Sequence, residues 1–127
     1  MVEGNRSSSG ALGERLACRY VQRLGWRVLA RNYRAARAEI DVIAEEGEEL
    51  VFVEVKTLAG SDFGEPEDRV EDFKQRQLSR AAIHYVTERR LEEREIRFDV
   101  IAVLLGDGEP RIEHFRSAFE LHRSFRA

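Results

Sequence analysis

Residues 38–58 read AEIDVIAEEGEELVFVEVKTL, and these residues alone predict two paired strands. Two runs rich in β-branched residues flank an acidic segment that contains Gly47, a pattern typical of an antiparallel hairpin. Along both runs, every second residue is aliphatic. The aliphatic residues of the two strands lie on the same face of the hairpin only when the residue numbers of each cross-strand pair add to an odd total. A two-residue loop at Gly47 and Glu48, with glycine first as in a type II′ turn, selects one such register.

That register predicts three cross-strand pairs: Ile40–Val55, Asp41–Glu54 and Val42–Val53. The Cβ atoms of directly opposed residues are about 5 Å apart, where like charges repel. A divalent cation would relieve this repulsion, because Mg²⁺ and Mn²⁺ bind carboxylate oxygens. The next allowed register would place Glu39 opposite Glu54 instead.

Lys56 follows Glu54 by two residues, so both side chains are expected on the same face of one strand. A metal ion and a lysine together can orient a hydrolytic water and stabilise charge on a phosphoryl group. The alternative is an ordinary hairpin whose solvated face carries a surface ion pair. The apolar run VFVEV predicts a central strand, where an acid and a lysine are rare without a function.

The remaining elements follow from hydrophobic periodicity. Leucine or tyrosine recurs every fourth residue in the first predicted helix, and Gly25 ends it. We predict helices over 11–24 and 68–90, strands over 27–34 and 95–105, a short edge strand over 111–115 and a helical tail from Ser117. The order α-β-β-β-α-β-β indicates an α/β domain with at least one antiparallel hairpin.

Other polar residues have both functional and structural interpretations. Glu14 lies at the edge of the apolar stripe of its helix, where it is a third candidate carboxylate or a glutamate favoured by the helix dipole. Lys74 and Gln77 could reach a phosphate or the active-site water, although Lys74 could equally extend to the surface. Three arginines share one helical stripe and either contact backbone phosphates or are simply solvated: Arg15, Arg19 and Arg23.

Several residues indicate packing rather than chemistry. Asp99 is interpreted as structural, and Cys18 and Trp26 as packing residues. The three histidines show no spacing of metal ligands and are predicted to have surface or interface roles: His84, His114 and His122.

The composition sets outer limits. A chain of 127 residues fits one domain, predicted over 10–127 after a flexible segment over 1–9. The net charge is −3, yet residues 15–37 contain seven arginines and no acid, so a basic N-terminal third precedes an acidic remainder. The single cysteine suits the cytoplasm. No apolar run approaches the roughly 20 residues of a membrane span, and no signal peptide is evident.

Four blocks of sequence resemble the YraN family of uncharacterised bacterial endonuclease-like proteins. They are GALGERLACRYVQRLGWRVLARNYR (10–34), AEIDVIA (38–44), LVFVEVKT (50–57) and RFDVIAV (97–103), and the resemblance runs from Gly10 to Phe119. That family is similar to the restriction-endonuclease-like, PD-(D/E)xK superfamily, which includes archaeal Holliday-junction resolvases. The resemblance implies an αβββαβ core with a mixed sheet flanked by helices. Its metal motif would fall on Asp41 and Glu54-Val55-Lys56, and its helix glutamate on Glu14.

Three positions depart from the pattern that the resemblance implies. The family usually has glycine where this chain has Ala38 and often arginine where it has Leu58, and the superfamily has proline where it has Ile40. The change at Leu58 removes a phosphate contact, so it affects the grip on a substrate more than metal binding.

The sequence therefore predicts a metal-dependent endonuclease that hydrolyses DNA phosphodiester bonds, with selectivity for DNA structure as one option. Mg²⁺ or Mn²⁺ would be held by Asp41, Glu54 and the Val55 carbonyl, with Lys56 orienting water and Glu14 in support. The alternatives are a nucleic-acid-binding or adaptor domain without turnover, and an interaction protein whose acidic part binds a basic partner. DNA is the expected partner, no membrane is expected, and a homodimer is suggested only by analogy with two-fold symmetric nucleases.

Overall fold

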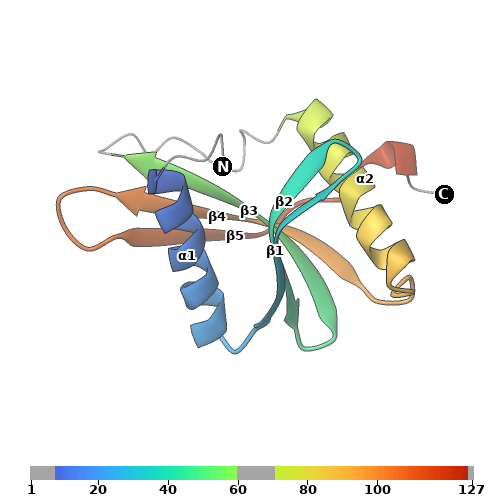
Figure 1. Cartoon of the computed structure of the whole chain (residues 1–127), viewed down its shortest axis with the longest axis horizontal. Coiled ribbons are helices and arrows are strands. Elements are labelled where there is room, and N and C mark those ends of the chain that lie inside the picture. Colours follow the sequence, from blue (N-terminus) through green and yellow to red (C-terminus); the bar gives the residue numbers. More distant parts are fainter. Residues whose placement is uncertain (1–7, 60–70, 126–127) are drawn as a thin grey trace.

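The computed structural model of the chain describes residues 8–59 and 71–125, with only the backbone described at Ser8 and Ser9. Its elements are α1 (Ser8–Arg23), β1 (Arg27–Ala35), β2 (Ala38–Glu46), β3 (Glu49–Ala59), α2 (Asp72–Glu88), β4 (Ile96–Leu105), β5 (Arg111–Phe119) and a short 3₁₀ helix, η2 (Arg123–Phe125) (Figure 1). Residues 1–7 of the predicted flexible segment (1–9) and the predicted helix start at Asp68 lie outside the described residues, whereas Ser8 and Ser9 belong to α1.

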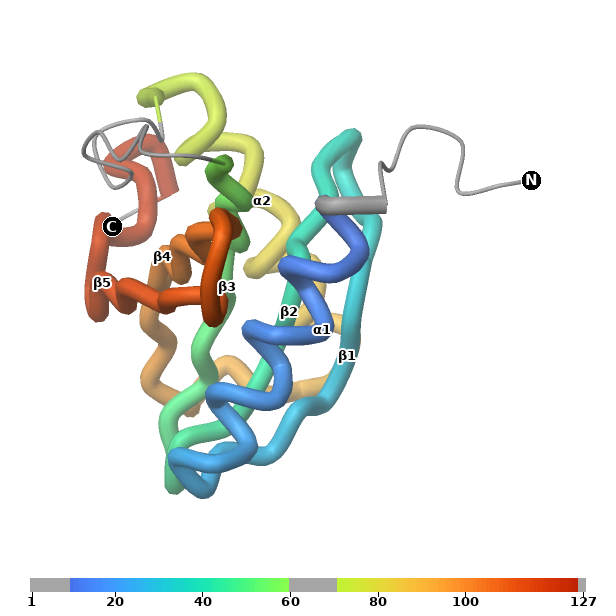
Figure 2. Tube along the Cα trace, turned by 90° about the vertical axis from the view of Figure 1, so that its left-hand side faces the viewer, coloured from blue at the N-terminus to red at the C-terminus, as the bar shows by residue number. Residues whose placement is uncertain are grey.

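A single mixed sheet organises these elements. The strand order is β1-β2-β3-β4-β5, with β3 and β4 parallel and every other pair antiparallel. The strand that carries VFVEV is therefore central, as predicted. Helices α1 and α2 cover opposite faces of the sheet (Figures 1 and 2). The predicted α/β class, with an αβββαβ core and helices on both sides of a mixed sheet, is confirmed.

Each face of the sheet has its own apolar core. The core under α1 contains Ala17, Cys18, Val21, Trp26, Val42, Ala44, Val51, Val53, Ile101 and Val103. The core under α2 contains Ile40, Ile43, Leu50, Phe52, Leu78, Ala81, Ala82, Tyr85, Val86, Phe98 and Val100. Because β3 and β4 are buried on both faces, their sequences are almost continuously apolar rather than alternating. A polar residue within β3 or β4 is therefore unusual and is a candidate for a structural or functional role.

The β2–β3 hairpin adopts the predicted register over most of its length. Glu46 pairs with Glu49, Val42 pairs with Val53, and the first loop residue, Gly47, has a φ of 62°. The predicted pairing of Ile40 with Val55, on the same face as Val42, is wrong. Ile40 packs in the core under α2, whereas Val42 packs under α1, so the alternation along β2 breaks at the residue between them, Asp41.

The C-terminal region also differs from the prediction. The helical tail expected from Ser117 is wrong, because β5 continues to Phe119 and only the three residues of η2 are helical. A bulge explains the difference. The register between β4 and β5 shifts beside Asp99, and Ser117 adopts a φ of 52° there. The backbone N–H of Ser117 donates to Asp99 Oδ1 at 3.0 Å, which holds the bulge in place.

No helix within the two described ranges is long and apolar enough to cross a membrane.

Candidate metal site

The candidate site begins where the β2–β3 ladder ends. Beyond the Val42–Val53 pair the two strands no longer exchange backbone hydrogen bonds in register. Instead, the Val55 N–H donates to Asp41 Oδ2 at 2.7 Å. The Asp41 side chain thus takes the role of a backbone acceptor, and its carboxylate lies between the strands. Asp41 and Glu54 are neighbours here, but they are not a paired position of the ladder as predicted.

Two further carboxylates join Asp41 from other parts of the chain. Oxygens of Glu14, Glu39 and Asp41 all lie within 4.8 Å of one another. Glu14 comes from α1 and is only 5% exposed, and Asn32 Nδ2 donates to Glu14 Oε1 at 2.9 Å. Glu39 precedes Asp41 by two residues in β2, and oxygens of both side chains reach the same cluster. Two elements, α1 and β2, thus bring three hard oxygen donors together.

Glu54 adds a fourth carboxylate, and two lysines contact it. Glu54 is 7% exposed, and its Oε2 lies 2.7 Å from Lys74 Nζ and 3.8 Å from Lys56 Nζ. Lys74 comes from the first turn of α2, so this helix reaches the site from the opposite face to α1. Burial lowers the pKa of Lys74, but the carboxylate of Glu54 outweighs that effect and the net pKa is raised. Lys74 therefore stays charged.

The electrostatics of Asp41 reflect this crowding. Burial and then the negative charge of Glu54 raise the pKa of Asp41 to about 8, against the opposing hydrogen bond from the Val55 N–H. Glu14 raises it further, and Lys74 lowers it. A carboxyl group with such a pKa is mostly protonated at pH 7 unless a cation is bound nearby. Carboxyl groups shifted in this way are concentrated at functional sites.

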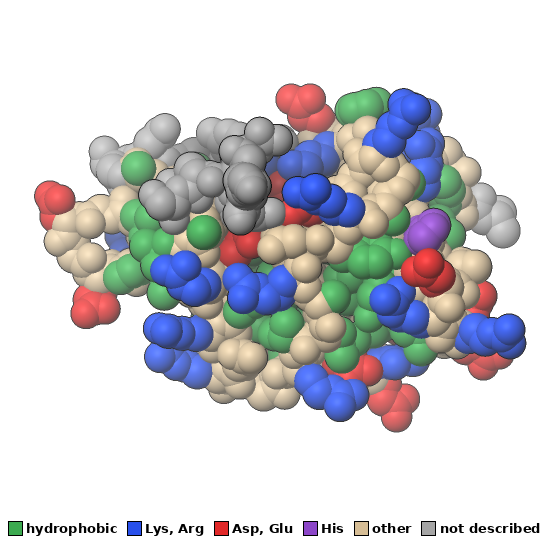
Figure 3. Space-filling model, in the orientation of Figure 1, with side chains coloured by type: hydrophobic (Ala, Val, Ile, Leu, Met, Phe, Trp, Pro, Cys, Tyr) green, Lys and Arg blue, Asp and Glu red, His purple; other side chains and the backbone are tan. Residues whose placement is uncertain are grey.

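The predicted site residues fall into two groups. The site contains Glu14, Asp41, Glu54, Lys56 and Lys74, and the Val55 N–H donates to Asp41. The role of the Val55 carbonyl as a metal ligand stays a prediction. Gln77 is half-buried farther along α2, and Arg15, Arg19 and Arg23 are exposed on α1. Basic side chains gather over α1 in the space-filling view, so a role for these arginines remains a prediction (Figure 3).

Sequence reasoning missed Glu39 and Asn32 as site residues. The signal for Glu39 was present, because two acids separated by one residue in a strand share a face. Asn32 gave no comparable signal. It adopts a left-handed φ of 54° in β1, and only the docking of α1 against that strand brings it to Glu14.

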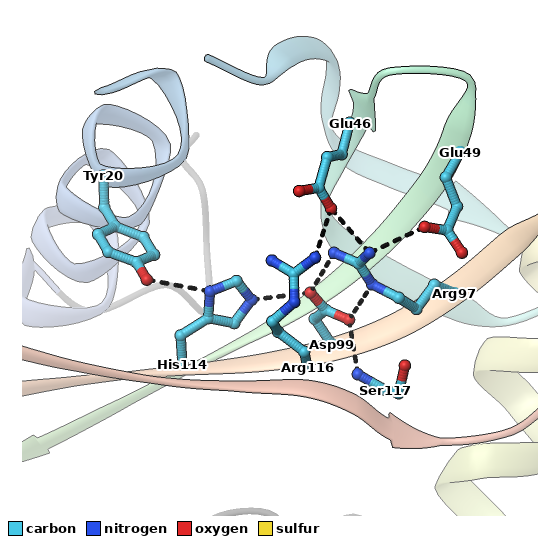
Figure 4. A network of polar contacts seen from close by, with 8 residues as sticks. All are labelled: Tyr20, Glu46, Glu49, Arg97, Asp99, His114, Arg116 and Ser117. Carbon is cyan, nitrogen blue, oxygen red and sulfur yellow. Dashed lines mark hydrogen bonds and ion pairs between the residues drawn. The ribbon is translucent and has the colours of Figure 1, made fainter. Parts of the chain in front are cut away.

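A second polar cluster, centred on Asp99, lies on the α1 face of the sheet (Figure 4). Asp99 is completely buried, bonds Arg97 through both carboxylate oxygens and lies 2.7 Å from His114 Nε2. Arg97 also pairs with Glu46 and Glu49. Burial raises the pKa of Asp99, but the hydrogen bonds from His114 and Arg97 outweigh it and the net pKa is lowered. Every charge in this cluster has a partner, which agrees with the structural role predicted for Asp99.

Two of the histidine predictions are wrong. The side chain of His114 is 7% exposed and bridges Asp99 to the Tyr20 hydroxyl, 3.0 Å away. His122 is also buried, and its backbone N–H donates to Ser79 Oγ at 2.9 Å, which ties the C-terminal segment to α2. The partners of both histidines are far away in the sequence, so the spacing of residues along the chain does not predict these contacts. His84 is exposed, as predicted.

Comparisons with known proteins identify relatives along most of the chain. The model of the uncharacterised protein family UPF0102 matches residues 13–103. A UPF0102 protein of Geobacter sulfurreducens is 46% identical over 113 residues, which are 88% of each chain. A UPF0102 protein of Anaeromyxobacter dehalogenans is 44% identical over 115 residues (91% of this chain and 86% of the relative), and one of Rhodococcus opacus is 44% identical over 111 residues (87% and 94%).

Proposed function

Since the chain belongs to the UPF0102 family, the family that its sequence resembled, we propose from the site itself that the protein is a metal-dependent phosphodiesterase acting on DNA. The observation that carries this proposal is the meeting of Glu14, Glu39 and Asp41, three carboxylates from two elements, beside a buried Glu54. Such a concentration of negative charge destabilises a fold unless a ligand uses it.

The residues fit a divalent cation. Their donors are carboxylate oxygens, which Mg²⁺ and Mn²⁺ prefer, and no thiol or imidazole is among them. Asp41 and Glu54 would hold the ion, with the Val55 carbonyl, Glu14 and Glu39 as further ligands or supports for them. When bound, the ion would lower the pKa of a water molecule and neutralise charge on the phosphoryl oxygens.

The chain's own residues supply the remaining requirements of hydrolysis. Lys56 projects from the same side of β3 as Glu54, and its ammonium is suited to orienting a water and to stabilising a phosphorane-like transition state. Lys74 holds the Glu54 carboxylate in place and offers a second positive charge for a phosphate. The apolar cores on both faces of the central strand keep these groups rigid, which such catalysis requires.

One observation favours a second candidate, a nucleic-acid-binding domain without turnover. Lys74 Nζ lies 2.7 Å from Glu54 Oε2, so the protein can satisfy this carboxylate with its own ammonium group. If that ion pair persists in solution, Glu54 is a structural partner of α2 and does not bind metal. The two candidates differ in metal affinity and in cleavage.

The test is a calorimetric titration with Mn²⁺, followed by cleavage assays on branched, single-stranded and duplex DNA. Wild type should bind Mn²⁺, and Asp41→Asn should not, whereas Asp107→Asn in the exposed β4–β5 loop is the matched control and should bind like wild type. Cleavage by the wild type should require the metal and disappear in Asp41→Asn. Binding of DNA without any metal-dependent cleavage would reject the enzyme in favour of the binding domain.

A further inference from the structure

The turn between β1 and β2 has an unusual composition for its geometry. Ala35 pairs with Ala38, which leaves Ala36 and Arg37 as a two-residue loop. Both loop residues have positive φ, 52° for Ala36 and 65° for Arg37. Two left-handed residues in a two-residue loop are typical of a type I′ turn, in which asparagine and glycine are preferred. Each residue with a Cβ there is disfavoured by roughly 1 kcal/mol, so folding alone does not explain an arginine at this position.

The turn borders the candidate metal site. Arg34 Nε lies 3.3 Å from Glu39 Oε1, and Glu39 is one of the three clustered carboxylates. A surface hollow of about 460 Å³ is lined by Arg34, Ala35, Arg37, Ala38 and Glu39. This hollow therefore connects the turn to the edge of the site. Its size is sufficient for a phosphate group with part of its sugar.

The two arginines of the hollow are available to a ligand. The Arg34 side chain is 74% exposed, and among the described residues its one polar contact is the exposed one with Glu39. Arg37 is also exposed, and within residues 8–59 and 71–125 its side chain makes no hydrogen bond or ion pair. In the space-filling view, acidic atoms near the centre of the face have basic side chains on both sides, over α1 and over the β1–β2 hairpin (Figure 3). These basic groups would neutralise part of the charge of a polyanion at the acidic site.

We propose that the β1–β2 turn binds the DNA backbone at a phosphate adjacent to the one at the metal site, through the guanidinium groups of Arg37 and Arg34. This inference rests on the proposed function and adds to it the position of the DNA strand next to the metal site. A guanidinium group is suited to a phosphate because it donates two parallel hydrogen bonds. Contacts of this kind position the backbone without reading the sequence of bases. Arg37 is exposed in the turn that joins β1 to β2.

Glycine substitution separates this function from folding. Arg37→Gly removes the guanidinium group and also relieves the left-handed backbone, so it should leave stability unchanged or raise it. Arg90→Gly is the matched control, because Arg90 is exposed and has a φ of 58°, but it follows the C-terminal end of α2. Lys74, in the first turn of that helix, is 16 residues away, which is about 24 Å along the helix axis.

The measurement is fluorescence anisotropy with labelled single-stranded and duplex DNA, in EDTA, over a series of salt concentrations. Arg37→Gly should raise the Kd by about 3- to 10-fold. It should also reduce the slope of log Kd against log salt by about 0.9 for duplex or about 0.7 for single strands, the effect of one lost phosphate contact. Arg34→Ala should act in the same direction. Arg37→Lys keeps the charge but loses the paired hydrogen bonds, so it should keep the salt slope of wild type and only part of the affinity. Arg90→Gly should bind like wild type.

The outcomes separate this inference from the proposed function. The inference is overturned if Arg37→Gly binds with wild-type affinity and salt slope, if Arg90→Gly loses as much affinity, or if wild type binds no DNA at low salt. Because these measurements exclude metal, they do not depend on cleavage. If Arg37→Gly alone weakens binding while the wild type shows no metal-dependent cleavage, the backbone contact is supported and the enzymatic proposal fails.

Discussion

Neutralising Asp41 should stabilise the metal-free protein at neutral and alkaline pH. The pKa of Asp41 is raised to about 8 in the folded protein from an ordinary value of 3.8, because of burial and the nearby Glu54. Between these two pH values the folded protein keeps a proton that the unfolded chain has lost. Raising the pH through this window therefore favours the unfolded chain, and the stability of the wild type should fall. Asp41→Asn removes the titrating group, while its side-chain oxygen can still accept the Val55 N–H.

The size of the effect follows from the shift. One proton changes the free energy of unfolding by at most about 1.4 kcal/mol per pH unit, so the upper limit between pH 5 and pH 8 is about 4 kcal/mol. Asp41 is only partly shielded from solvent and the site can relax, so we expect about 1–2 kcal/mol. The carboxyl groups with lowered pKa, Asp99 among them, contribute stability that is lost only below about pH 4, outside this window.

Urea unfolding, followed by fluorescence of the single tryptophan, gives the required measurement. Trp26 is 5% exposed in the core under α1, so its emission reports the loss of that core. In EDTA, the variant and the wild type should be equally stable at pH 5, and the variant should be more stable at pH 8. Mn²⁺ should then stabilise the wild type alone, because a ligand of the folded state shifts the equilibrium by mass action. A variant that is less stable than wild type by more than about 1 kcal/mol at pH 8 would mean that Asp41 is a satisfied, ionised structural group, and the reasoning would fail.

Three further substitutions test other parts of the molecule. Lys56→Ala should leave Mn²⁺ affinity unchanged or slightly tighter and lower single-turnover cleavage of DNA by about 10²-fold or more, and equal rates would show that Lys56 is not catalytic. Asp99→Asn should lower the free energy of unfolding in urea by about 1.5–3 kcal/mol, because it removes the buried carboxylate that bonds Arg97 and His114, although Arg97 keeps Glu46 and Glu49 as partners. A loss below about 1 kcal/mol would contradict this. Gly13→Ala would put a Cβ in collision with Thr57 Oγ1 and should lower the free energy of unfolding by about 1–3 kcal/mol. Adding Thr57→Ala should recover most of that loss of stability, and no recovery would exclude the collision as its cause.

The hairpin could be predicted from sequence because its information is local. The aliphatic alternation of β2 and β3 restricted the register, and Gly47 fixed the loop, so Val42 and Val53 were paired correctly. The central position of β3 also followed from its composition. Glu14 could be located because one helical period determines which residues approach the buried stripe. Each of these inferences depended on one regular element or on two strands joined by a short loop.

The remaining features depend on how separate elements dock. The break in alternation at Asp41 arises where β2 turns toward the core under α2, and no local pattern marks it. The contact between Lys74 and Glu54 depends on the position of α2 against the sheet, so sequence reasoning predicted a phosphate ligand but not an ion pair with this carboxylate. The extension of β5 depends on a bulge that a buried aspartate on the neighbouring strand holds. Side-chain contacts across a sheet are not encoded by spacing within one strand.

The contrast between Asp41 and Asp99 gives the strongest physical reason to regard the carboxylate cluster as functional. The sheet neutralises Asp99 with Arg97, His114 and a backbone N–H, and its pKa is lowered. Asp41 instead lies near Glu14 of α1 and near Glu39 and Glu54 of the sheet, and its pKa is raised even though Lys74 lowers it. This excess of negative charge costs folding free energy, so it supports the proposal that the cluster binds a ligand, and a divalent cation would match both its sign and its oxygen donors.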